Sequence, residues 1–218
     1  MLKEMKEMAP LYEKHVFWDT QPVPKFLESK EKEVTQGPLE KKEVKDVRAE
    51  PYALPDPFEW VEIDITKDIA LNEVYDFLRD NYVGDRSGNY RFRYTPQFIR
   101  WALTPPDYQK DWIIGVRVKA NKKLVGFITG VPLKISIRGT IVEMTAIDFL
   151  CIHTKVRAKR LAPVLIKEVT RRINLKGIWQ AIYTIGKPIP TPIAYTRYYY
   201  RSINYKKLLD VIIVFILD

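Results

Sequence analysis

Cysteine, histidine and long apolar stretches are all scarce in this 218-residue chain. Its single cysteine, Cys151, has no partner for an intramolecular disulfide, which fits a reducing compartment. The two histidines, His15 and His153, have no second ligand at metal spacing, so no metal site is predicted. No run approaches the roughly 20 apolar residues that span a bilayer, and residues 1–4 lack the apolar block of a signal peptide. We therefore expect a soluble, cytosolic protein without a transmembrane segment.

Acidic residues are too few to balance the basic ones, and the formal net charge is +9 at pH 7. Such an excess favours a polyanion, a phosphate-bearing ligand or an acidic surface as partner, without deciding among them. Part of the excess lies in Lys-rich stretches such as residues 41–45, which are typical of a solvated linker. A nucleic-acid-binding function would rest on charge alone, because the chain carries no recognised RNA or DNA motif. Nucleic acid is therefore not an expected partner.

The first 50 residues are predicted to form an arm and a linker. Residues 13–27 combine three aromatic residues with two prolines, which favours an extended segment that lies against a body. Residues 28–50 are mostly charged or polar, have no aromatic residue and contain the breaker Gln36-Gly37-Pro38. The predicted organisation is an arm with a charged linker over residues 1–50 and one domain over residues 51–218.

Hydrophobic periodicity predicts a mixed order of strands and helices from residue 51 onward. Strands are expected at residues 58–65, 112–118, 124–131, 133–138, 141–152, 178–184 and 208–217, with breaks at Asn121 and Pro132. Helices are expected at residues 68–78, 95–103, 162–173 and 196–202. This order is that of the GNAT acyltransferase fold. The predicted class is α/β (α+β), a mixed and mostly antiparallel sheet flanked by helices.

A basic loop between the strand at 141–152 and the next helix is the most informative local feature. Residues 153–160 deliver four cations, Lys155, Arg157, Lys159 and Arg160, to a helix start, where free N–H groups favour an anion. A CoA pyrophosphate fits such a cradle, although a basic surface loop would show the same residues. The GNAT signature Arg/Gln-x-x-Gly-x-Gly/Ala is met at Arg157 and Ala162, with Arg160 at the usual middle glycine.

A longer string that contains this loop is far more specific. Residues 149–172, Phe-Leu-Cys-Ile-His-Thr-Lys-Val-Arg-Ala-Lys-Arg-Leu-Ala-Pro-Val-Leu-Ile-Lys-Glu-Val-Thr-Arg-Arg, closely resemble the signature of eukaryotic protein N-myristoyltransferases (glycylpeptide N-tetradecanoyltransferases). Supporting strings follow the family's order: Phe-Trp-Asp-Thr-Gln-Pro-Val-Pro at 17–24, Phe-Arg-Tyr-Thr-Pro-Gln-Phe at 92–98, Lys-Leu-Val-Gly-Phe-Ile at 123–128, Tyr183-Thr184-x-Gly186 and Arg197-Tyr198. The resemblance covers roughly residues 13 to 208 and the N-terminal half of the family.

The resemblance implies a transferase that moves myristate from myristoyl-CoA to the amine of an N-terminal glycine. It implies an oxyanion hole from the backbone N–H groups of Phe149 and Leu150, where donors are worth a few kcal/mol each. The implied donor site comprises Val16, Phe17, Trp18, Phe149, Leu150, Cys151, Ile152, Arg157, Ala158, Lys159, Arg160, Leu161, Ala162 and Pro163. The implied acceptor-peptide site comprises Tyr82, Tyr90, Tyr94, Asp148, Thr184, Gly186 and Tyr198.

Several of these residues also have a purely structural interpretation. Phe17 and Trp18 could only fasten the arm to the core, and Phe149 and Leu150 are ordinary core-strand residue types. The tyrosines implied for the peptide site could be packing residues in a chain with 13 tyrosines. Cys151 lies in an apolar strand without an evident base, which favours a small core residue over a nucleophile.

The chain departs from the family pattern at the acceptor side. Asp148 stands where the family has an asparagine, Tyr200 stands where it has a histidine, and the acidic loop after Tyr82 is Gly84-Asp85-Arg86-Ser87 here. Peptide specificity is therefore expected to differ.

The family's second half, whose C-terminal carboxylate is the base for the glycine amine, has no counterpart in this sequence. We expect the chain to bind myristoyl-CoA but not to complete the reaction alone. The alternative is a truncated, noncatalytic acyl-CoA-binding module. The apolar tail at residues 211–217 would have to be buried as a strand or paired with another chain.

Overall fold

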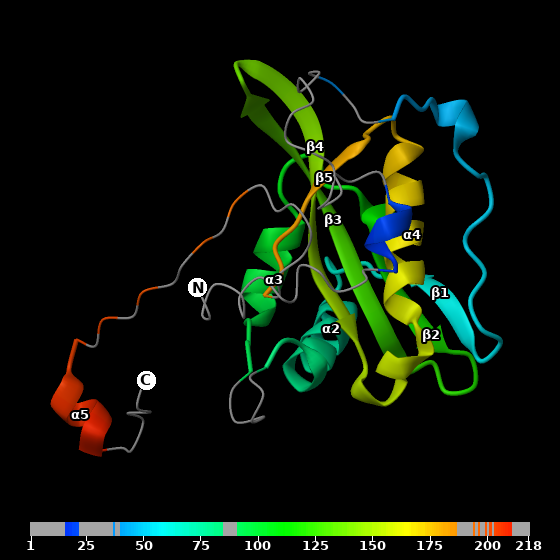
Figure 1. The fold of residues 1–218 in the computed structure, drawn as a ribbon. Helices are drawn as coiled ribbons and strands as arrows, with labels where there is room; N and C mark the ends of the chain where they lie inside the picture. Colours follow the sequence, from blue (N-terminus) through cyan, green and yellow to red (C-terminus); the bar gives the residue numbers. More distant parts are fainter. Residues whose placement is uncertain are drawn as a thin grey trace. The chain divides into compact units, whose positions relative to one another are not determined.

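The fold was analysed in a computed structural model, which describes residues 16–21, 37, 40–84, 91–186, 194, 196, 199, 201 and 203–210. The chain divides into two compact units. The larger unit, Val34–Gly186, contains the sheet and its helices, and the smaller unit combines Met1–Glu33 with Lys187–Asp218 (Figure 1).

The larger unit is built on a five-stranded sheet in which spatial order follows chain order, β1-β2-β3-β4-β5. The strands are β1 Phe58–Glu62, β2 Ile113–Val118, β3 Leu124–Ile137, β4 Thr140–Ile152 and β5 Gln180–Ile182. The first four pair antiparallel, and only β5 runs parallel to its neighbour β4. The predicted class, a mixed and mostly antiparallel sheet flanked by helices in a GNAT-like fold, is confirmed.

The predicted break at Pro132 is wrong, because β3 runs through it as one long strand. Pro132 pairs with Thr145 of β4, whereas β2 pairs with β3 only as far as Thr129. Proline lacks an N–H donor and is tolerated where a strand has a free edge. At Pro132, β3 has lost its β2 neighbour, so the missing donor leaves the ladder with β4 intact.

Helices cover both faces of the sheet, and each follows its predicted apolar period. They are α2 Asp68–Asn81, α3 Pro96–Leu103 and α4 Leu161–Asn174, with short 3-10 turns at Val44–Asp46, Lys110–Trp112 and Thr154–Lys159. Thr95 caps α3 by accepting the Phe98 N–H at 3.2 Å, with Pro96 in the first turn.

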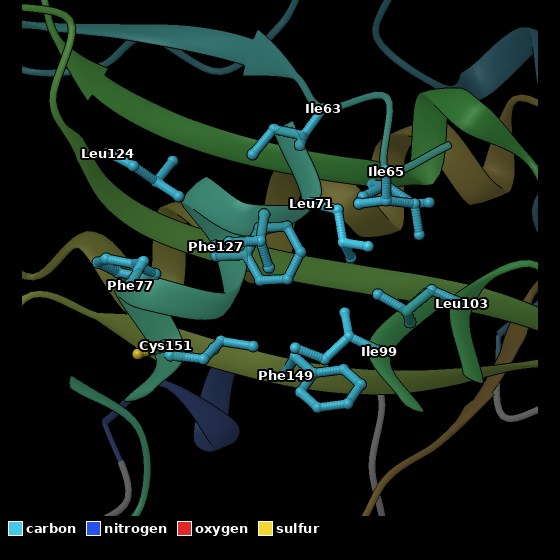
Figure 2. Close-up of a cluster of buried hydrophobic side chains, with 13 residues drawn as sticks. Ile63, Ile65, Leu71, Phe77, Ile99, Leu103, Leu124, Phe127, Phe149 and Cys151 are labelled. Carbon is cyan, nitrogen blue, oxygen red and sulfur yellow. The ribbon is translucent and has the colours of Figure 1, made fainter. Parts of the chain in front are cut away.

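Two apolar cores result from this layering. α2 and α3 pack on one face, where the buried side chains include Leu71, Phe77, Ile99, Phe127 and Phe149 (Figure 2). α4 packs on the other face, and its Leu165 and Val169 are fully buried against the strands. Phe149 and Cys151 therefore belong to the α2–α3 face, and Ile152 to the α4 face.

A buried ion cluster joins α4 to the segment that precedes β1. Glu168 has no exposed surface and accepts from Arg171 at 2.7 and 2.9 Å and from Arg172 at 2.9 Å. Its second oxygen accepts the Tyr52 N–H at 3.0 Å, and Arg171 donates to the Ala49 carbonyl at 3.0 Å. Residues 49–52 are therefore fixed to α4 through one carboxylate and its arginine.

The described part of the smaller unit holds a 3-10 turn, Trp18–Thr20, and a short helix, α5 Tyr205–Asp210. The strand predicted at 208–217 is wrong for residues 208–210, which lie in α5; Asn204 Oδ1 accepts the Lys207 N–H at 3.0 Å and starts the helix there. Residues 211–217, and most of the helix predicted at 196–202, lie outside the described residues. No helix within the described ranges is long and apolar enough to cross a membrane.

Candidate functional site

A β-bulge interrupts β4 at the two residues from which an oxyanion hole was expected. Phe127 pairs with Cys151 and Thr129 with Asp148, so Phe149 and Leu150 together lie opposite the single residue Ile128. Phe149 has φ of 54°, a left-handed conformation that bulky residues rarely adopt. The bulge thus takes Phe149 and Leu150 out of the regular register with β3.

The side chain of Phe149 holds this bulge against the core. It is 7% exposed and lies 5.8 Å from the Tyr82 ring and 5.6 Å from the Tyr94 ring, centroid to centroid. Thr129 donates its hydroxyl to the Asp148 carbonyl at 3.0 Å, immediately before the bulge. Burial and this hydrogen bond offset the cost of the left-handed backbone, so the bulge is a specified feature of the strand.

After β4, the chain makes the 3-10 turn at Thr154–Lys159 and enters α4 through Arg160. Arg160 has φ of 54° and is the N-cap of α4, without a side-chain cap. The first N–H groups of a helix lack intrahelical partners, and the helix dipole adds positive potential there. The exposed cations Lys155, Lys159 and Arg160 surround this end, so the geometry suits an anion with several oxygens.

Arg157 differs from the other cations of the loop, because its guanidinium is already engaged by the backbone. It donates to the Ile152 carbonyl at 3.1 Å and to the Asn81 carbonyl at 2.5 Å. Asn81, at the end of α2, also accepts the Thr154 N–H at 3.2 Å through its side chain. Arg157 therefore ties the end of α2 to the turn, and its structural role is to position the loop.

The role of Arg157 is testable by amide hydrogen exchange. Because its two acceptors require the planar fork of a guanidinium, Arg157→Lys should resemble Arg157→Ala and not the native chain. We expect the Thr154 amide to exchange roughly tenfold faster or more in both variants, as local opening becomes easier. Lys159→Ala is the matched control and should leave this amide unchanged. Native protection in the lysine variant would show that charge alone holds the turn.

A pocket of about 400 Å³ lies between the end of α2, the bulge and the start of α4. Its lining includes five residues implied for the donor site and four from the end of α2: Leu150, Cys151, Ile152, Arg157, Ala162, Asn81, Tyr82, Val83 and Gly84. Tyr82, expected on the acceptor side, thus lies in the wall of the same pocket. The volume falls in the range of small-molecule sites.

No residue at the end of α2 was expected in the donor site; Tyr82 was expected there only as part of the acceptor-peptide site. A sequence signal for Asn81 does exist, since Val74, Phe77, Leu78 and Asn81 share one helical face. Asn81 is a buried polar residue on that apolar face, and its side chain donates to the Phe77 carbonyl at 3.0 Å. If the predicted helix had been extended from residue 78 to residue 81, Asn81 would have been recognised as a polar residue on the apolar face of the helix.

An aromatic cluster flanks the bulge on the α2–α3 face; it comprises Tyr82, Phe92, Tyr94, Phe98 and Phe149. Tyr94 stacks on Phe98 at 4.9 Å and on Phe92 at 6.1 Å, and its edge meets the Phe149 ring at 88°. Phe92 and Phe98 are exposed, so the cluster forms an apolar surface open to solvent.

Three titratable groups near the bulge have raised pKa values. Burial raises the pKa of the Cys151 thiol to about 12, which leaves a neutral thiol at physiological pH. Burial, with Tyr94, Asp148 and Cys151 nearby, raises the pKa of Tyr82 to about 12. Partial desolvation by neighbouring atoms raises the pKa of the Asp148 carboxyl, although the residue retains solvent contact. A cysteine nucleophile is therefore disfavoured.

The remaining expected site residues divide into four groups. Ala158, Lys159, Arg160, Leu161 and Pro163 lie in the loop and first turn of α4. Thr184 and Gly186 follow β5 and are exposed, and Val16, Phe17 and Trp18 belong to the smaller unit, where the Phe17 and Trp18 rings meet edge to face at 4.9 Å. Tyr90 and Tyr198 lie outside the described residues. Within the described ranges, no group of three residues could hold a metal ion.

The sheet, the bulge and the basic helix start together define a GNAT-like α/β domain. The family model described as "Myristoyl-CoA:protein N-myristoyltransferase, N-terminal domain" matches residues 38–196. The chain belongs to the N-myristoyltransferase family.

Relatives and a solved structure agree with this assignment. The glycylpeptide N-tetradecanoyltransferase of Dictyostelium discoideum is 53% identical over 90% of this chain and 47% of its own length. Glycylpeptide N-tetradecanoyltransferase 1 of Arabidopsis thaliana is 50% identical over 90% of this chain and 46% of its own length. A crystal structure of Saccharomyces cerevisiae N-myristoyltransferase with bound myristoyl-CoA superposes with a TM-score of 0.84 at 46% identity, over 91% of this chain and 47% of that one. The chain thus spans about half the length of the relatives it matches.

Proposed function

We propose that this chain is the donor-binding half of a protein N-myristoyltransferase, which transfers myristate from myristoyl-CoA to the N-terminal glycine of proteins. The observation that carries the proposal is the bulge at Phe149 and Leu150, of which Leu150 lines a pocket beside a basic helix start. The solved yeast relative was crystallised with bound myristoyl-CoA, which supports the choice of donor.

In this proposal the bulge supplies the oxyanion hole. The backbone N–H groups of Phe149 and Leu150 donate to the thioester carbonyl oxygen as negative charge develops on it, and each is worth a few kcal/mol. The Cys151 thiol stays protonated, with its pKa raised to about 12 by burial, so the amine attacks the thioester directly. No covalent enzyme intermediate and no metal take part.

The start of α4 holds the phosphates of CoA. Lys159, Arg160 and the free N–H groups of Leu161 and Ala162 bind the anion, while Arg157 positions the turn through the Asn81 carbonyl. The rest of the proposed donor site in the larger unit is completed by neighbours of these residues: Cys151, Ile152, Ala158 and Pro163.

The acceptor peptide enters on the side of the aromatic cluster. The residues of the larger unit that are proposed to contact it are Tyr82, Tyr90, Tyr94, Asp148, Thr184 and Gly186. Exposed rings at Phe92 and Phe98 give this side an apolar surface next to the bulge, which suits a peptide segment lying across it. The noncatalytic alternative predicts donor binding without any turnover of a glycine-initiated peptide, and a mass-spectrometric acylation assay separates the two.

Donor binding should depend on the cations at the start of α4. Calorimetric titration with a nonhydrolysable myristoyl-CoA analogue should show an affinity loss of roughly tenfold to a hundredfold when Lys155, Lys159 and Arg160 become alanine, because charge-assisted contacts to phosphate are lost. The matched control replaces Lys41, Lys42 and Lys45, which removes the same charge from the linker. If both triple variants lose the same affinity for the donor analogue, net charge alone explains the effect. If the variant at Lys155, Lys159 and Arg160 keeps its affinity, the phosphate cradle is refuted.

We infer that the compartment is the cytosol. The free cysteine and the absence of a spanning helix within the described ranges support this inference. Fractionation of cells that express the tagged chain checks it, and recovery in a membrane pellet after a salt wash would contradict it.

A further inference from the structure

His153 lies at the junction between β4 and the basic turn Thr154–Lys159. Its backbone N–H donates to the Val125 carbonyl of β3 at 2.9 Å, so the residue is still attached to the sheet. Its φ of −53° and ψ of 132° are not helical, as is required of the residue that caps a helical turn. His153 therefore fixes the point at which the turn leaves the strand.

The first N–H groups of a helical turn have no partner within the turn and need acceptors from outside it. The Thr154 N–H donates to the Asn81 side chain at 3.2 Å, and the Lys155 N–H donates to Nδ1 of the His153 ring at 3.2 Å. The Val156 N–H donates to the His153 carbonyl at 2.9 Å. Of these three acceptors only the imidazole titrates near neutral pH, so the cap on Lys155 is sensitive to protons.

The ring can accept this N–H only in its neutral form, because protonation occupies the lone pair of Nδ1. Burial lowers the pKa of the ring from its ordinary value of 6.5, and three positive groups lower it further: Lys123 before β3, and Lys155 and Arg157 in the turn. The end of α2 meets the turn through Asn81, which carries no charge. The ring is therefore neutral at pH 7 and able to cap the turn.

We propose that His153 is a pH-sensitive positioning residue of the donor site, whose neutral ring caps the turn and whose protonation releases it. The inference rests on the proposed function, because that function identifies the anion as a CoA phosphate. When Nδ1 gains a proton, the Lys155 N–H faces a second N–H and loses its acceptor. The turn then opens more easily, and Lys155, Lys159 and Arg160 are no longer held in place around the anion.

The direction of the pH effect follows from the two states of the turn. In the opened turn the ring is solvated and titrates near its ordinary pKa of 6.5, whereas in the closed turn its pKa is lower. Below about pH 6.5 the open state therefore binds more protons than the closed state, and acid favours opening. The closed turn has its full stability above that pH and loses it as pH falls through the lower pKa of the capped ring.

Amide hydrogen exchange of the full chain without donor, at about pH 8 and about pH 5, tests the inference. In the native chain, protection of the Lys155 amide relative to an unstructured peptide should fall roughly twofold to thirtyfold on acidification, the range for a lost N-cap. His153→Asn provides an oxygen that accepts the same N–H and does not titrate, so protection should persist at both pH values. His153→Ala should show the low protection at both.

Donor affinity gives a second readout. A phosphate monoester also titrates near roughly pH 6, so the native chain is compared with His153→Asn at each pH. Calorimetric titration with the nonhydrolysable myristoyl-CoA analogue should give equal affinities at about pH 8 and a native affinity roughly twofold to thirtyfold weaker than that of the variant at about pH 5. The matched control is His15→Asn, which removes the other histidine of the chain and should keep the native pH response.

The outcomes separate this inference from the proposed function. Protection of the Lys155 amide that is the same at both pH values in the native chain, or that falls equally in His153→Asn, overturns the inference. A native chain that binds the analogue more tightly than His153→Asn in acid also overturns it, because the charge of the ring would then attract phosphate directly. If the analogue does not bind at all, the proposed function is refuted, whereas exchange at Lys155 still judges the cap.

Discussion

Replacing Glu168 with alanine will lower the free energy of unfolding by about 3–5 kcal/mol, because it leaves two arginines without their buried carboxylate. Glu168 is fully buried, and it accepts from Arg171, Arg172 and the Tyr52 backbone. The loss also frees the segment before β1 from α4. Urea unfolding followed by circular dichroism measures the change, and the thermal midpoint should fall by roughly 6–20 °C.

A surface ion pair provides the matched control for Glu168. Glu143 pairs with Lys134 at 3.2 Å with both side chains more than half exposed, so Glu143→Ala should cost less than about 1 kcal/mol. Comparable losses in the two variants would mean that the buried cluster is no stronger than a surface pair.

The stability due to Glu168 should also depend on pH. Burial alone would raise the pKa of this carboxyl, but hydrogen bonds from Arg171, Arg172 and the Tyr52 N–H outweigh burial and lower it from its ordinary value of 4.5. The stabilisation is therefore complete above about pH 4.5 and is lost as pH falls through the lower, folded-state pKa. The stability difference between the native chain and Glu168→Gln should narrow over that acidic window, and a constant difference would contradict the ion-pair explanation.

In a strand, a glycine variant is usually less stable than the alanine variant at the same position. At Phe149 we expect the glycine variant to be the more stable of the two. Phe149→Ala removes a buried ring and should cost about 3–5 kcal/mol. Phe149→Gly removes the same ring but also relieves the left-handed backbone, which costs a non-glycine residue about 1–2 kcal/mol. Since glycine loses about 0.5–1 kcal/mol more backbone entropy on folding, the glycine variant should be the more stable by a few tenths to about 1 kcal/mol.

Phe127 is the control for this reversal. It is fully buried in the same core, pairs with Cys151 and has an ordinary strand conformation. Phe127→Gly should therefore be less stable than Phe127→Ala by about 0.5–1 kcal/mol. Chemical denaturation of the four variants decides the matter, and a normal order at Phe149 would show that the bulge relaxes when its ring is removed.

Most of the fold can be predicted from local patterns in the sequence. The apolar period of α4 and the Thr95-Pro96 start of α3 are short-range signals, and both helices form within one or two residues of the predicted bounds. The predicted strand break at Pro132 was wrong because β3 accepts a proline only where β2 no longer pairs with it. Where β2 ends depends on the whole sheet and cannot be seen in the sequence of β3. The tail at 208–210 was misjudged because an apolar run carries no period that separates a strand from a helix.

The sequence motif predicted part of the pocket lining, but it did not predict the residues that join it from elsewhere in the chain or the backbone conformation at the bulge. The residues that line the pocket from β4 and α4 were expected from one continuous string, whereas Asn81, Val83 and Gly84 come from a segment about 70 residues earlier in the chain. The left-handed φ of Phe149 has no signature in residue type, since glycine or asparagine would be the usual choice there. Arg157 appeared as one cation among several until its two carbonyl acceptors separated it from its neighbours.

Pro132 has a consequence for self-association. Beyond Thr129, β3 stays paired with β4 on one side, and its other side presents an edge that no described strand covers (Figure 1). Such an edge can recruit the same edge of another molecule and seed intermolecular sheets. A proline at that edge removes one donor from any incoming ladder and obstructs its approach. Pro132, which was expected to break the strand, thus leaves β3 continuous and protects its open edge from pairing with a second copy.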